Sequence, residues 1–181
     1  MADLISERLE VDDDFEAVQD LYLERGWTDG LPVVPPTTER VEAMLAATPL
    51  SPQDIIGEIP PNWGSATVEK LAVNAVMAGC RPEYLPVVIA AVEAMCDEAF
   101  NLYAIQATTH PCAPLIIVNG PIREELGLHG GSGAFGPGWQ PNATIGRAVR
   151  LVQLNVGGAH PGVGDMSTQG APSKYTYCVA E

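Results

Sequence analysis

Three histidines and one cysteine of this chain lie in loops rich in glycine and proline, where side chains can meet a ligand. His110 and Cys112 stand in Thr-Thr-His-Pro-Cys, and they share one face if that segment is extended. His129 and His160 each lie in a glycine-rich loop. An imidazole titrates near neutral pH, and a thiolate is a nucleophile, so we predict acid–base or nucleophilic chemistry for these four residues. The alternative places Cys112 in the core and His110 at a loop end. His110 and Cys112 could also be two metal ligands, but two ligands are not a site unless His129 and His160 converge with them, and we assign no metal-binding residue.

A second candidate feature is the glycine-rich segment 128–138, which precedes a predicted helix. Glycines let backbone N–H groups approach a ligand, and the N-terminus of a helix attracts an anion. We therefore predict that Ser132, Asn142 and Thr144 position a small anionic molecule, and that Arg147 pairs with its carboxylate or phosphate. The spacing fits neither a P-loop nor a dinucleotide fingerprint. A tightly packed linker is the alternative.

Three further residues are predicted to bind substrate, each with a structural alternative. Asp29 lies between glycines in a loop and could instead bond its own backbone in a turn. Trp63 forms an aromatic wall before a predicted helix. Asn74 stands on an otherwise apolar helix face, where a buried amide needs partners. No particular cofactor is indicated.

Apolar periodicity predicts the elements that position these residues. A helix from Asn142 or Thr144 to Val156 separates the two glycine-rich loops, which therefore share a site only if another element or subunit joins them. We predict an α/β fold with a layered sheet, helices packed on it and Gly-rich loops at helix ends. The other predicted helices span 14–26, 38–47, 65–79 (with Ser65 as N-cap) and 82–96, and the predicted strands span 54–59, 105–109, 113–120 and 175–179.

Length and charge limit the class of protein. The 181 residues fit one domain, and with 46% apolar against 18% charged residues the chain is not globally disordered. We predict a flexible acidic arm over 1–13 and a single α/β domain over 14–181. The net charge is −14, of which residues 1–60 carry −11, so nucleic acid and anionic membrane surfaces are unlikely partners.

Several absences in the sequence favour a cytoplasmic location. No apolar stretch is long enough to span a membrane, and the acidic N-terminus does not resemble a signal peptide. The four cysteines (Cys80, Cys96, Cys112 and Cys178) form no C-x-x-C pair, so we expect buried free thiols.

Three strings of residues resemble the bacterial UGSC-like family, some of whose members are selenoproteins. They are GWTDGLPVVPPT (26–37), AVNAVMAGCRPEY (72–84) and the closing KYTYCVAE (174–181). The resemblance implies a match to the N-terminal portion of a longer protein. The family is named for a selenocysteine or cysteine followed by Gly-Ser-Cys, and this chain has no Cys-Gly-Ser-Cys, so that motif transfers to no residue here.

Two hypotheses of different classes follow. The first is an enzyme or enzyme subunit that acts on a small polar or anionic organic molecule, with thiol- or histidine-dependent redox or lyase chemistry completed by a partner chain. The second is a non-catalytic binding or assembly subunit, in which the apolar helices over 66–78 and 82–96 pack against a partner. Both predict a homo- or hetero-oligomer, and the domain would be one half of a larger assembly.

Overall fold

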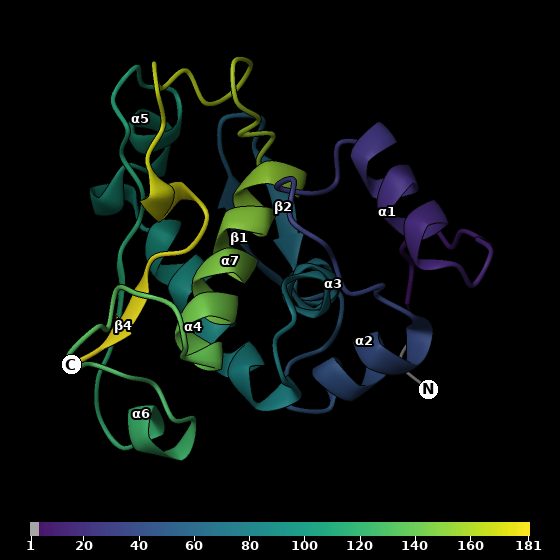
Figure 1. Ribbon diagram of the computed structural model, residues 1–181, viewed down its shortest axis with the longest axis horizontal. Coiled ribbons are helices and arrows are strands. Elements are labelled where there is room, and N and C mark those ends of the chain that lie inside the picture. The colour runs from purple at the N-terminus through teal and green to yellow at the C-terminus, as the bar shows by residue number, and fades with distance from the viewer. Residues whose placement is uncertain (1–3) are drawn as a thin grey trace.

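The chain forms helices and a few short strands (Figure 1). The structure is a computed structural model and describes residues 4–181. The helices are α1 (Phe15–Glu24), α2 (Thr38–Leu45), α3 (Val68–Ala78), α4 (Leu85–Met95), α5 (Leu102–Gln106), α6 (Ile122–Glu125) and α7 (Gln140–Asn155). The strands are β1 (Ile55–Ile59), β2 (Gly64–Thr67), β3 (Ile116–Val118) and β4 (Cys178–Ala180), and 3-10 turns span Pro82–Tyr84, Glu98–Phe100 and Pro172–Lys174.

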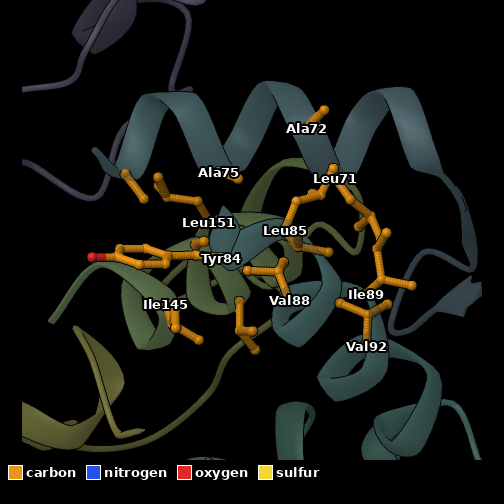
Figure 2. Close-up of a cluster of buried hydrophobic side chains, with 14 of the residues drawn as sticks. Leu71, Ala72, Ala75, Tyr84, Leu85, Val88, Ile89, Val92, Ile145 and Leu151 are labelled. Atoms are coloured by element: carbon orange, nitrogen blue, oxygen red, sulfur yellow. The ribbon is translucent and has the colours of Figure 1, made fainter. Parts of the chain in front are cut away.

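Three helices, α3, α4 and α7, enclose the hydrophobic core. Figure 2 shows Leu71 and Ala75 of α3 above Leu85 of α4 and Leu151 of α7, and all four side chains are fully buried. Helix α4 begins with Pro86 in its first turn, where a missing N–H is tolerated. Helix α3 ends at Gly79, whose φ of 87° is the left-handed conformation that glycine adopts without strain.

The strands of residues 4–181 form two separate two-stranded sheets. β1 and β2 pair antiparallel, and β3 and β4 pair parallel. A mixed α/β fold is therefore present, but the structure does not confirm the single layered sheet expected from the sequence. The strands are short, and helices α3, α4 and α7 take the central place that a larger sheet would occupy.

Two local predictions are wrong. Ser65 does not cap a helix: it lies in β2, and Thr67 caps α3 by accepting a hydrogen bond from the amide of Lys70. The segment predicted as a strand over 105–109 is instead the end of α5 and a turn, because Asn101 caps a helix four residues earlier. Antiparallel pairing with the preceding strand β1 decides the first case, and a cap decides the second.

Residues 5 and 6 of the predicted flexible arm are attached to α3. The carboxylate of Glu69, itself 1% exposed, accepts hydrogen bonds from the amides of Ile5 (3.1 Å) and Ser6 (2.9 Å). The side-chain amide of Gln53 donates a third bond of 2.7 Å. Glu69 thus fixes residues 5 and 6 against the body of the protein.

The attachment at Glu69 is expected to be pH-dependent. Burial by itself would raise the pKa of Glu69, but hydrogen bonds from Ser6, Ile5 and Gln53 outweigh burial and leave the pKa lowered. Such a carboxyl stabilises the folded state above its ordinary pKa, and this contribution is lost as the pH falls through the lowered value. In an NMR titration, the Ile5 and Ser6 amide signals should therefore move with a midpoint below about 4.3, the ordinary glutamate value.

Glu69→Gln should abolish that transition, whereas Glu16→Gln on the exposed face of α1 should preserve it. Amide signals typical of an unstructured segment at neutral pH would contradict the attachment.

Candidate functional site

Arg147 and Asp29, both predicted to bind substrate, bind each other. Nε and Nη2 of Arg147 each lie 2.8 Å from an Asp29 carboxylate oxygen, and Nη2 also donates to the carbonyls of Leu31 and Pro32. The side chains are only 14% and 4% exposed. The guanidinium therefore holds the 26–37 loop against α7. Its Nε and Nη2 donors are occupied by hydrogen bonds to that loop.

His129 is the most firmly oriented of the three histidines. Its ring stacks on Trp139 with centroids 3.9 Å apart, and Nε2 lies 2.9 Å from the carbonyl oxygen of Ser132. Because a carbonyl only accepts, Nε2–H is the donor in this contact, and Nδ1 takes no part in it. The side chain of Asn142 binds the backbone N–H and C=O of His129, so this amide shapes the loop.

The other residues predicted to bind substrate make contacts within the fold. Asn74 accepts a 2.7 Å hydrogen bond from Asn155, which also bonds the Trp27 carbonyl. The Thr144 hydroxyl donates to the Gln140 carbonyl within α7. Trp63 is 56% exposed and stacks on Tyr103, with ring centroids 6.0 Å apart.

His110 and Cys112 are exposed on the loop before β3, where Nδ1 of His110 lies 3.2 Å from the Thr108 hydroxyl. The backbone carbonyl of His160 accepts from three amides of the 160–165 turn. Within residues 4–181, no hydrogen bond joins any two of the three histidines, and no group of three or more His, Cys, Asp or Glu could hold a metal ion. The 16 residues of α7 separate the loops of His129 and His160, as predicted.

Two of the four thiols are unsuited to nucleophilic chemistry. Burial raises the pKa of Cys80 and of Cys178 to about 12, and Thr144 offsets only part of this at Cys80. A thiol that stays protonated at neutral pH is a poor nucleophile and packs as an apolar side chain. Cys96 is half-buried, and burial raises its pKa as well.

We predict that iodoacetamide at mildly alkaline pH labels exposed Cys112 in the native protein and leaves Cys80 and Cys178 unmodified. Mass spectrometry of peptides would locate the label, and urea-unfolded protein, in which all four cysteines react, is the control. Labelling of Cys80 at the rate of Cys112 would contradict its burial.

A buried charged cluster in the C-terminal part of the chain was not predicted from the sequence. Asp165 is 2% exposed, and its Oδ2 accepts from Lys174 (2.7 Å) and Arg150 (3.1 Å). Ser167 donates to Oδ1. Burial alone would raise the pKa of Asp165, but the hydrogen bonds from Lys174 and Ser167 outweigh it and leave the pKa lowered. The cluster holds the 160–175 segment against α7.

An apolar groove runs between α4 and the segment that contains β3. Its volume is about 640 Å³. We call it the α4–β3 groove, and its main walls are Val87, Ala90, Ala91 and Ala94 on one side and Leu115 and Ile117 on the other. None of the residues that line it is charged. Leu115 and Ile117 are 39% and 53% exposed, which is unusual for a strand as apolar as 113–120.

The free edge of β3 forms one border of this groove. Ile116 donates to Tyr177, and the amide of Glu181 donates to Val118, so residues 116 and 118 direct their backbone groups toward β4. In this parallel ladder the N–H and C=O of Ile117 consequently point the other way. No strand among residues 4–181 pairs with that edge. The outer edge of β4, in contrast, is covered by His129, whose carbonyl accepts from Ala180.

The groove is a feature that the sequence indicated only in part. The helix over 82–96 is apolar nearly all round, which predicts burial against more than one neighbour. The structure supplies α3 and α7 for one side of α4 and leaves Ala90 and Ala94 exposed on the other. The sequence contained no signal for where the open side would lie.

Comparison of the chain with protein-family models, curated proteins and solved structures finds no match. The resemblance to the UGSC-like family stays a prediction. Within the described residues, no helix has the length and apolarity needed to cross a membrane.

Proposed function

We propose that the chain is a binding and assembly subunit whose α4–β3 groove receives a segment of another polypeptide. The observation that carries this proposal is the groove itself: about 640 Å³, uncharged, and bordered by a strand edge without a partner strand in residues 4–181. A contiguous exposed apolar surface on a soluble domain typically marks an interaction site. A free strand edge is the usual place where an extended segment binds.

The polar residues support the same proposal. Hydrogen bonds join Arg147 to Asp29, and Asn142 bonds to the backbone of His129. These bonds leave few free donors for a small anion. A subunit that relies on a partner for its chemistry needs no complete catalytic cluster of its own. In this proposal α4 packs against the partner, as the second hypothesis from the sequence expects.

A third strand beside β3 would also extend the β3–β4 sheet toward the layered sheet expected from the sequence. The added strand would lie beside Ile117, along the Ala90 and Ala94 face of α4. We therefore propose that the layered sheet forms in the assembly, of which this domain is one half.

The size of the native complex in producing cells tests this proposal. Wild-type protein in a gently prepared extract should migrate well above the 19.2 kDa of the chain, and Ala90→Glu should shift it to the monomer position. A buried unpaired carboxylate in an apolar interface is strongly unfavourable, whereas Ala90 is exposed in the isolated chain. Leu23→Glu, on exposed α1, is the matched control and should leave the complex intact.

An enzyme that acts on a small polar or anionic organic molecule is the second candidate, favoured by His129. Its ring is stacked, its Nε2–H is bound, and Nδ1 is available as a base beside the glycine-rich loop. A partner chain would supply the redox or lyase chemistry. A ligand-observed NMR screen of small organic anions tests this candidate: binding that His129→Ala abolishes would support it, and no binding to the wild type would contradict it.

A further inference from the structure

Resting on the proposed role of the α4–β3 groove, we infer that its occupant is a second copy of this chain. The two β3 strands pair antiparallel across a two-fold axis that passes beside Ile117. The result is a continuous four-stranded sheet in the order β4, β3, β3 of the second copy, β4 of the second copy. Such an isologous contact closes on itself and gives a dimer.

The hydrogen-bonding pattern of β3 is self-complementary. Ile117 directs both its N–H and its C=O away from β4. In an antiparallel ladder, two residues that directly face each other in a hydrogen-bonded pair exchange both bonds. Ile117 of each copy meets Ile117 of the other in this way, and two backbone hydrogen bonds form on the axis. Pro114, which lacks an N–H, stands three residues away and removes neither bond.

The groove has space for the added strand because α4 presents small side chains beside the edge. Ala90, Ala91 and Ala94 form much of this face, Val87 and Met95 also line the groove, and Val88 and Val92 are buried in the core. Neighbouring strands lie about 4.8 Å apart. A second β3 therefore fits next to the first only where the facing side chains of α4 are small. The exposed side chain of Ile117 becomes buried in the pair.

The charge distribution permits two strongly acidic chains to meet here. Residues 1–60 carry −11 of the net −14, and they include α1 and α2. Figure 1 shows α1 and α2 on the side of the molecule opposite to β4, the partner of β3. The groove lining itself is uncharged. The exposed carboxylate of Glu93 lies on α4 outside this lining.

Sedimentation velocity of the purified chain across the micromolar range tests this inference. Wild type should sediment as a dimer of the 19.2 kDa chain. Ile117→Pro removes an N–H that does not bond to β4, together with the Ile117 side chain, and should weaken dimerisation by about tenfold or more, at least the loss expected for two hydrogen bonds. Ile117→Val keeps the N–H and should remain dimeric. Circular dichroism checks that each variant is folded.

Ala90→Glu provides a second variant that does not touch the strand, and it should also give a monomer, while Leu23→Glu stays dimeric. A wild-type monomer at all concentrations, or a dimer unaffected by both Ile117→Pro and Ala90→Glu, would overturn the inference. If the purified chain is monomeric but Ala90→Glu still dissociates a larger complex in cell extract, the inference of a second copy is wrong and the proposed assembly function is supported. If neither experiment detects association, both fail.

Discussion

Asp165→Asn is expected to lower the free energy of unfolding by about 3–5 kcal/mol, the cost of removing one partner from a buried ion pair. The substitution keeps the shape of the side chain and removes its charge. Arg150 and Lys174, whose side chains are 9% and 10% exposed, would then lie in the interior without a counter-charge. Urea unfolding at neutral pH, followed by circular dichroism, measures the loss.

Glu124→Gln is the matched control for this prediction. Its ion pair with Arg123 is exposed, with side chains 39% and 78% accessible, so the change should stay within about 0.5 kcal/mol. If both variants lose the same free energy of unfolding, burial of the Asp165 cluster adds nothing to its stabilising effect.

The pH dependence of stability gives an independent check on Asp165. Its folded pKa is lowered, so the carboxylate stabilises the fold above its ordinary pKa, near 3.9, and that contribution disappears as the pH falls through the lowered value. Wild type should therefore lose stability in this acidic range more steeply than Asp165→Asn. Parallel curves would contradict the lowered pKa.

Arg147→Met should cost a similar amount, about 3–5 kcal/mol, because it leaves the buried carboxylate of Asp29 unpaired. The carbonyls of Leu31 and Pro32 lose a donor at the same time. Arg81→Met, at an exposed arginine, controls for loss of positive charge. Urea unfolding measures both variants.

A double-mutant cycle with Asp29→Asn separates the pair from its surroundings. If the two residues act mainly on each other, the double variant should be much less destabilised than the sum of the single losses. Unchanged stability in Arg147→Met, together with lost binding of a small anion, would instead favour the ligand-binding role predicted from the sequence.

Local signals predicted most helices of the fold. Asp14 and Thr37 cap α1 and α2 as expected for their residue types, and glycine ends α3. The strands were harder, because pairing over a distance decides them. β3, which is shorter than its apolar run, pairs with β4, a strand far away in the sequence, and β2 is a four-residue segment, Gly64–Thr67, that pairs with the preceding strand β1.

The candidate site was less predictable for the same reason. Asp29 and Arg147 are 118 residues apart, and each looks like a free ligand-binding group until the fold brings them together. Asn142 of α7 and His129 of the preceding glycine-rich loop are 13 residues apart, and the sequence identified both residues but not the hydrogen bonds between them. Arg150 offered one usable signal for the missed cluster: a cation on the apolar stripe of a helix requires a buried anion.

Photo-cross-linking from position 90 tests the central claim, that the α4–β3 groove is a protein interface, most directly. A benzophenone amino acid in place of Ala90 would be activated in producing cells, and the cross-linked peptide identified by mass spectrometry. The account predicts a cross-link to the 114–119 segment of a second copy and none from the same probe at exposed Leu23. A cross-link to a different polypeptide would keep the interface but refute the second copy, and no intermolecular product from position 90 would contradict the claim itself.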